Sequence, residues 1–215
     1  MINFKEKDIV SLREKVKERL SEKRYIHTLG VEDMAVKLGV KCLPDRIGEL
    51  RVAALLHDIS KEYSEAEHFE LINQHNICLT ESDVSTPAIW HSITAPIVIE
   101  RDFSEYATPS VLSAVRNHTV GEADMSVFDE IIFLADYIEE GRRYISCKEV
   151  REEFFRLASS TDNAMENIYA LHKATLSSLD NTIKFFVSKN EPFHERTEST
   201  RVAILAKLER QKYGN

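Results

Sequence analysis

The chain has 215 residues, enough for one sizeable hydrophobic core, and a formal net charge of −8 at pH 7. This acidic balance argues against a nucleic-acid-binding surface but leaves room for a small phosphorylated substrate. No apolar run is long enough to span a bilayer, and the N-terminus lacks the apolar core of a signal peptide. The three cysteines form no CxxC pair, so we expect a reduced, cytoplasmic protein with a small-molecule partner and without a membrane or nucleic-acid partner. The sequence leaves open whether the protein forms a homodimer.

The apolar residues recur at helical spacing nearly throughout the chain. With only six glycines and five prolines, and no strictly alternating Val, Ile or Thr run, strands are hard to find. We therefore predict an all-α protein with a helical core over residues 1–145 and a helical C-terminal extension over residues 146–215. The extension should hold two or three helices and pack on the core, which makes a single domain overall.

The first two helices are predicted from this spacing. Residues 8–24 have the amphipathic pattern of a surface helix. The next helix carries His27 four residues before Val31, on the same face, so His27 points into the core. Gly39 is predicted to end this second helix, and Pro44 suits the first turn of the third.

The third helix ends in the adjacent pair His57 and Asp58. Ala53, Ala54 and His57 share one apolar face. A carboxylate buried beside them needs a cation or several hydrogen-bond donors. The pair alone is weak evidence for a metal site, but Lys61 follows one turn later as a candidate cation for an anionic substrate.

Capping residues mark the next helices. Ser64 and Glu67 form a capping box, and His68 and His75 on this helix are interpreted as surface residues. Thr-Pro pairs at 86–87 and 108–109 place a capping threonine before a proline. The two helices that they start carry His91 and His118, the latter on an apolar face.

Ser126 and Asp129 predict the start of a helix that is buried nearly all round. Asp136 interrupts its apolar run from 131 to 138, so this carboxylate should be paired, hydrogen-bonded or bound to a metal. Residues 139–143 are expected to return to solvent. Farther on, His172 and His194 are assigned no role in a site.

Six polar residues thus lie on or at the end of apolar helical faces. Each histidine could be a core residue bonded to a backbone carbonyl, and each aspartate could bind a neighbouring helix. One shared metal centre accounts for all of them together, and imidazole with carboxylate suits iron, manganese, zinc or similar ions. The six residues are His27, His57, Asp58, His91, His118 and Asp136.

Four sequence blocks, 24–31, 54–61, 117–121 and 131–139, together resemble the YqeK branch of the HD-domain superfamily of metal-dependent phosphohydrolases. The resemblance implies a helical HD-domain bundle over residues 1–145. It also implies symmetrical hydrolysis of diadenosine tetraphosphate to two ADP, by metal-activated water attack on an inner phosphorus. Two positions depart from the family pattern, Ser92 in place of glycine and Glu140 in place of proline, and neither is a proposed ligand.

The resemblance further implies that His27, His57, Asp58 and Asp136 hold the principal divalent metal. Iron is expected first, as one or two ions, with manganese, cobalt or zinc as alternatives. His91 and His118 would hold a second metal or bind phosphate. Asp58 and Lys61 are the expected catalytic residues. The predicted substrate contacts are Lys61 and Arg24, with Thr119 and Arg142 as further candidates, and for Lys61 and Arg24 a solvated surface cation is the competing interpretation.

Other functions stay open at this point. The alternatives are a nucleoside monophosphatase, a guanosine-polyphosphate hydrolase, an oxygen-activating di-iron enzyme of the same superfamily, and a module that senses nucleotides without cleaving them. The nature of the products separates the hydrolases, because two ADP from one dinucleotide indicates symmetrical cleavage. The complete ligand set disfavours the sensing module.

Overall fold

A computed structural model describes residues 4–159 and 163–213. Within these ranges all regular elements are helices, as the sequence predicted. Short 3₁₀ turns at Pro44–Arg46, Pro87–Ile89 and Ser104–Tyr106 precede or link some of them. The α-helices are α1 (Glu6–Lys17), α2 (Glu22–Cys42), α3 (Ile47–Leu56), α4 (Glu65–Gln74), α5 (Glu81–Ser85), α6 (Trp90–Asp102), α7 (Pro109–Asn117), α8 (Val127–Ile138), α9 (Ile145–Ala158), α10 (Ala164–Ser188) and α11 (Glu195–Tyr213).

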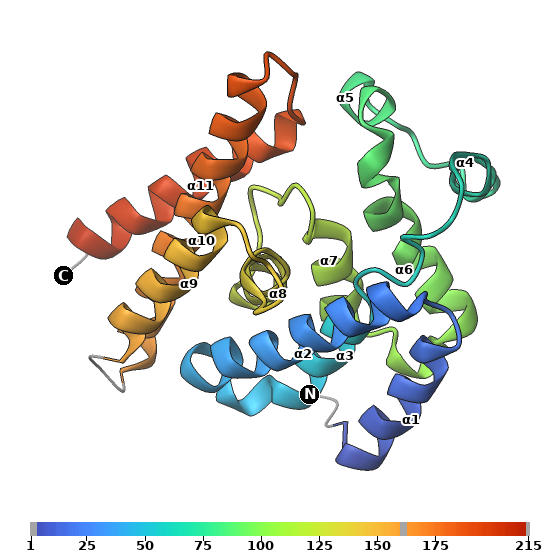
Figure 1. The fold of residues 1–215 in the computed structure, drawn as a ribbon, viewed down its shortest axis with the longest axis horizontal. Coiled ribbons are helices and arrows are strands. Elements are labelled where there is room, and N and C mark those ends of the chain that lie inside the picture. Colours follow the sequence, from blue (N-terminus) through green and yellow to red (C-terminus); the bar gives the residue numbers. More distant parts are fainter. Residues whose placement is uncertain (1–3, 160–162, 214–215) are drawn as a thin grey trace.

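The centre of the bundle is built from α2, α3, α7 and α8, in which α3 and α8 each contact the other three helices. Figure 1 shows α9, α10 and α11 together on one side of these helices and α4, α5 and α6 on the other. Leu38, Leu55 and Phe128, from three of the central helices, are fully buried in one continuous core. Over the described residues, no helix is both long and apolar enough to cross a membrane.

Two predicted helix ends are wrong. The helix expected over residues 8–24 is two helices, because Ser21 caps α2 by accepting a hydrogen bond from the Arg24 backbone N–H. The apolar spacing of α1 and α2 concealed this break. Gly39 does not end α2, which continues to Cys42. A Cβ at Gly39 would lie 2.5 Å from Leu50 Cδ1, so this glycine permits close packing of α2 against α3.

The predicted caps are confirmed at three helices. Ser64 with Glu67 and Ser126 with Asp129 form capping boxes, and the Thr108 hydroxyl accepts a hydrogen bond from the backbone of α7. These caps fix where α4, α7 and α8 begin. They thereby help to place His118 at the end of α7 and Asp136 near the end of α8.

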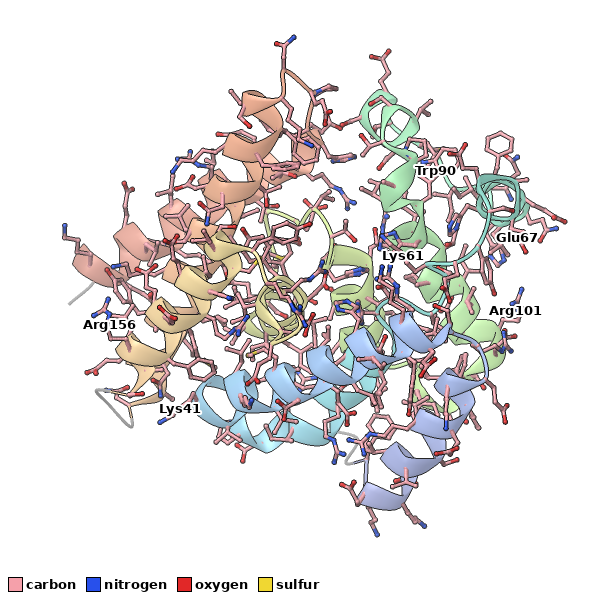
Figure 2. All side chains as sticks on the ribbon, in the orientation of Figure 1. Lys41, Lys61, Glu67, Trp90, Arg101 and Arg156 are labelled. Atoms are coloured by element: carbon pink, nitrogen blue, oxygen red, sulfur yellow. The ribbon has the colours of Figure 1, made fainter. Side chains whose placement is uncertain are left out.

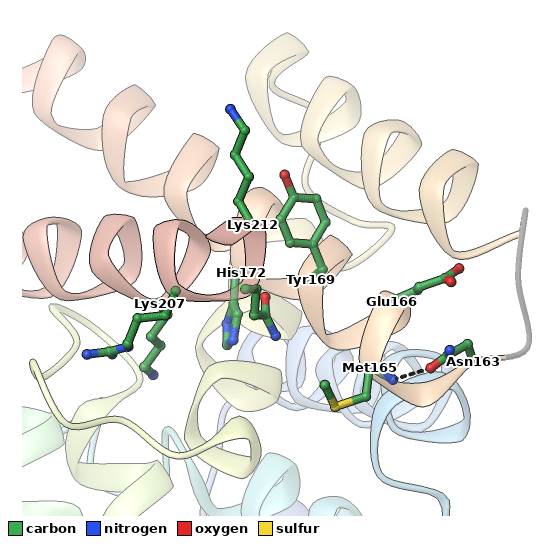
Figure 3. Close-up of a pocket in the computed structure, with 9 residues that line it drawn as sticks. Asn163, Met165, Glu166, Tyr169, His172, Lys207 and Lys212 are labelled. Carbon is green, nitrogen blue, oxygen red and sulfur yellow. Dashed lines mark hydrogen bonds between the residues drawn. The ribbon is translucent and has the colours of Figure 1, made fainter. Parts of the chain in front are cut away.

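The C-terminal region forms three helices, of which α10 packs on α2 and α8. Glu130 of α8 is fully buried and binds both His172 of α10, at 2.7 Å, and Lys207 of α11, at 2.6 Å. These two partners line a cavity of about 810 Å³ between α10 and α11 (Figure 3). None of the predicted site residues lines this cavity. The division at residue 145 stays a prediction.

Candidate metal centre

Three of the six predicted ligands are oriented by the same kind of hydrogen bond to the backbone. The Nδ1–H groups of His57, His91 and His118 donate to the backbone carbonyl three residues earlier, at 2.6, 2.9 and 2.7 Å. A donating Nδ1 leaves the lone pair on Nε2 when the ring is neutral. In all three residues the backbone therefore sets the tautomer that a metal ligand requires.

His27, from α2, is oriented differently. Its Nδ1 lies 3.2 Å from Glu139 Oε1, so a side-chain carboxylate accepts its N–H. Its Nε2 lies 3.0 Å from Asp136 Oδ1, without the alignment of a hydrogen bond. The Nε2 atoms of His27 and His57 are both buried and have no hydrogen-bond partner. Buried polar atoms are rarely left in this state unless a ligand or water completes them.

The nitrogen and oxygen atoms of the site converge around Asp58. His57 Nε2 lies 3.4 Å from Asp58 Oδ2, whereas His91 Nε2 and His118 Nε2 lie 3.3 and 3.6 Å from Oδ1. The Nε2 atoms of His91 and His118 are only 3.1 Å apart. With both Nδ1 atoms donating elsewhere, two lone pairs face each other, and the Lys61 ammonium and the Thr119 hydroxyl are the donors beside them. A bound cation would also relieve their repulsion.

The donor set therefore fits a divalent metal ion. His27, His57 and Asp136 form one group whose ligand atoms lie within 4.8 Å of one another, and His57, Asp58 and His118 form a second. Since His57 belongs to both groups, the arrangement suits one ion or two neighbouring ions. Imidazole nitrogens with carboxylate oxygens are ligands for iron, manganese and zinc alike.

Two arginines already contact the carboxylates of the site. Arg24 Nη1 lies 2.7 Å from Asp58 Oδ2, and Arg142 Nη2 lies 2.7 Å from Asp136 Oδ1. Arg142 also donates to the Asp136 backbone carbonyl. Both arginines predicted to contact substrate thus lie next to the candidate metal ligands, where they could also meet a phosphate.

Lys61 and Thr119 lie on the side of the site formed by His91 and His118. Lys61 Nζ is 3.2 Å from His91 Nε2, and the Thr119 hydroxyl is 3.2 and 3.1 Å from the Nε2 atoms of His91 and His118. In Figure 2 Lys61 lies near the middle of the molecule, whereas Arg101 and Arg156 lie at its edge. The Lys61 side chain is half-buried and its ammonium contacts His91, and its role as a substrate contact stays a prediction.

The electrostatics of the site favour charged carboxylates. Burial opposes ionisation of Asp58, but the histidines around it hold the pKa of this carboxyl well below its usual range. Burial, His118 and Lys61 hold the pKa of His91 well below its usual value. Burial lowers the pKa of His27, but the carboxylates of Asp136 and Glu139 outweigh it and raise this pKa to about 9. A metal that binds His27 Nε2 therefore competes with a proton.

Sequence reasoning missed Glu139, which it assigned to solvent. The Glu139 side chain is only 6% exposed and its carboxylate accepts from His27 and from the Gly141 backbone N–H. A Cβ at Gly30 would lie 2.7 Å from Glu139 Oε2, so α2 needs a glycine there to admit the carboxylate. The spacing was visible in the sequence, because Glu139 follows Asp136 by three residues and Gly30 follows His27 by three.

The remaining histidines lie outside the site. His68 was expected at the surface, but it is buried and its Nδ1 lies 2.8 Å from the Thr94 hydroxyl. His75 is exposed, as predicted. His172 and His194 bind the carboxylates of Glu130 and Asp83, respectively.

The two departures from the family pattern are accommodated away from the ligands. The Ser92 hydroxyl donates to the Ile89 carbonyl, and Glu140 forms an ion pair with Lys37. Neither bond involves a predicted site residue.

Two cavities open beside the candidate centre. The larger, about 940 Å³, has a highly charged lining that includes Arg24, His27 and Arg143. The smaller, about 310 Å³, includes Asp136 and several aromatic side chains. Arg142 and Tyr144 line both cavities. The site can therefore receive an extended ligand from two directions.

Comparison with known proteins agrees with this geometry. A family model described as HD domain matches residues 24–141, more than half of the chain. The chain is 30% identical over 177 residues to a protein of Bacillus subtilis named bis(5'-nucleosyl)-tetraphosphatase, symmetrical, and the match covers 82% of this chain and 87% of that protein. A protein of the same name from Halalkalibacterium halodurans is 33% identical over 193 residues, with coverages of 86% and 90%.

A solved structure shares the fold. The crystal structure of a predicted HD superfamily hydrolase involved in NAD metabolism, from Clostridium acetobutylicum, superposes with a TM-score of 0.79 at 29% sequence identity. It covers 95% of this chain and 100% of that one. The family match and the similarity across most of each relative show that this chain belongs to the HD domain family.

Proposed function

We propose that this protein is a metal-dependent hydrolase that cleaves diadenosine tetraphosphate symmetrically to two ADP. The observation that carries the proposal is the convergence of imidazole nitrogens around the Asp58 carboxylate. Relatives that match this chain over most of their length are named for this activity. The substrate of those relatives is here assigned to this chain.

His27, His57, Asp58 and Asp136 would hold the principal metal. His91 and His118 would hold a second ion or contact the phosphates. A bound divalent cation supplies Lewis acidity toward phosphoryl oxygens and makes a water molecule a better nucleophile at neutral pH. Iron is our first choice among the metals, because the resemblance implies it and the mixed nitrogen and oxygen ligands suit it.

The residues of the chain itself would bind and orient the polyphosphate. Arg24 and Arg142 each hold a ligand carboxylate in place and keep guanidinium N–H groups beside it for a phosphate oxygen. Lys61 would take up charge on the phosphoryl oxygens as the bond to the leaving ADP breaks. Burial lowers the pKa of Lys61, although Asp58 and Asp136 favour its charged form. The Thr119 hydroxyl can donate to a phosphate from the same side.

The setting of this activity is part of the proposal. We infer a cytoplasmic enzyme acting on a small dinucleotide and not on nucleic acid, which the three free cysteines and the acidic charge support. A homodimer is compatible with this proposal.

The test is product analysis with labelled water. Metal-loaded protein is incubated with diadenosine tetraphosphate in ¹⁸O-water, and the products are separated and weighed. We expect ADP alone, with label on the terminal phosphate of one ADP in each pair. AMP with ATP would refute symmetrical cleavage.

Variants connect the reaction to the site. Asp58→Asn and Asp136→Asn should lose bound metal and activity together. Asp124→Asn is the matched control, since Asp124 is an exposed aspartate that lines neither of the two cavities beside the centre. Full activity in both site variants would refute the proposed centre.

A further inference from the structure

The cavity of about 310 Å³ beside Asp136 has no role in the mechanism described above. Its lining comes from the end of α8, the start of α9 and the C-terminal part of α10. One end is polar and holds Asp136 and Arg142. The cavity therefore begins at a candidate metal ligand and a candidate phosphate contact and leads away from them.

The other walls are largely aromatic. Tyr137, Tyr144 and Phe185 line the cavity, and the side chains of Tyr144 and Phe185 are 73% and 51% exposed. Large aromatic rings that stay in water at the mouth of a cavity offer stacking surfaces for a planar ligand. Tyr144 follows Arg142 by two residues, so the stacking surface is joined directly to the polar end.

One amide side chain lies among these rings. Asn181 precedes Phe185 by four residues on α10, which places both on the same helix face. The Asn181 side chain lies near the Tyr137 hydroxyl and, with Ser146, opposes the rise in the pKa of Tyr137 that burial causes. An amide presents a donor next to an acceptor, and adenine presents the complementary pair at its N6 and N7 edge.

The size of the cavity limits its occupant. Sites for small molecules begin at about 300 Å³, so this cavity suits one nucleoside and not a whole dinucleotide. The charged cavity of about 940 Å³ shares the lining residues Arg142 and Tyr144 with it and has room for the other half of such a substrate.

We propose that the cavity between α8, α9 and α10 binds one purine nucleoside of the dinucleotide, an inference that rests on the proposed function. The base stacks on Tyr144 and Phe185, Asn181 selects adenine, and the phosphates pass Arg142 toward the metal centre. The nucleoside is thereby held at a fixed distance from the reacting phosphorus, which helps to select the bond that is cleaved.

The test measures binding without turnover. Calorimetry on the manganese-loaded full chain compares ADP, GDP and pyrophosphate for the wild type, Phe185→Ala and Asn181→Ala. Val187→Ala is the matched control, because Val187 is an exposed apolar residue of the same helix that does not line the cavity. We expect Phe185→Ala to weaken ADP at least about fivefold, the range for a lost stacking contact, and to leave pyrophosphate unchanged. Asn181→Ala should bring the affinities for ADP and GDP together.

The outcomes separate the pocket from the reaction. Unchanged ADP affinity in both variants would overturn the pocket, and a simultaneous change of oligomeric state in Phe185→Ala would assign these rings to an interface between copies. A third outcome is that the variants weaken ADP binding as expected while the wild type does not cleave diadenosine tetraphosphate. In that case the proposed reaction is wrong and the proposed nucleoside pocket is supported.

Discussion

The contact between Glu139 and His27 leads to a specific prediction about metal affinity. His27 is the one predicted histidine ligand whose Nδ1 is held by a side chain, since backbone carbonyls hold the other three. Replacement of Glu139 with alanine removes that partner and leaves the backbone of the site intact. The variant should therefore keep its fold and lose metal affinity.

The size of the loss follows from the contact. Removing the partner that orients a ligating histidine typically costs tenfold to a hundredfold in metal affinity. Glu139 is well buried and its other carboxylate oxygen is held by Gly141, so it is a rigid partner. We expect the middle of that range, about thirtyfold or about 2 kcal/mol.

The assay is competition for manganese or iron against a chromophoric chelator, with the free energy of unfolding measured in parallel. Glu140→Ala is the control, because Glu140 is the adjacent carboxylate, lies 65% exposed and pairs with Lys37 outside the site. Hydrolysis by the Glu139→Ala variant should recover when metal is raised to saturation. Equal metal affinity in the two variants would refute a role for Glu139 in orienting His27.

Four further outcomes are expected. Lys61→Ala should bind metal normally and reduce kcat about a hundredfold, the effect of removing one donor to a developing charge; unchanged kinetics would place Lys61 outside the reaction. Gly30→Ala should displace the Glu139 carboxylate and lower the metal affinity measured in competition assays, with little change in the free energy of unfolding in urea. Glu130→Ala should cost about 3 kcal/mol of unfolding free energy in urea because it leaves Lys207 and His172 without their shared partner, and a loss below about 1 kcal/mol would contradict this. Removal of metal with a chelator should lower the unfolding free energy by about 2.7 kcal/mol relative to protein at a hundredfold excess of metal over Kd, as measured by thermal denaturation.

Local chemistry made much of the fold predictable. Ser64, Thr108 and Ser126 mark helix starts through hydrogen bonds within a few residues, and such bonds depend little on the rest of the chain. The break between α1 and α2 was missed because both helices have apolar residues at compatible spacing. Gly39 was misinterpreted because its reason is the approach of Leu50 from another helix.

The site was predictable where a polar group interrupts an apolar face. Asp136 stands out within an apolar run, and His27, His57 and His118 share faces with buried residues. Glu139 begins the polar run that follows Ile138 at the end of α8, so apart from its three-residue spacing from Asp136 no local pattern distinguishes it from a solvated glutamate. Its burial depends on the packing of α2 against α8, and only the tertiary structure contains that information.

The candidate centre draws on residues from 27 to 139, and its first histidine has contacts with the last two acidic residues. Because the N-terminal part is synthesised first, His27 is made more than a hundred residues before Asp136 and Glu139. A nascent chain that ends before α8 therefore has no complete set of ligands. Binding of a metal by the full ligand set is therefore possible only after the chain has been made through residue 139, so shorter nascent chains lack the complete centre.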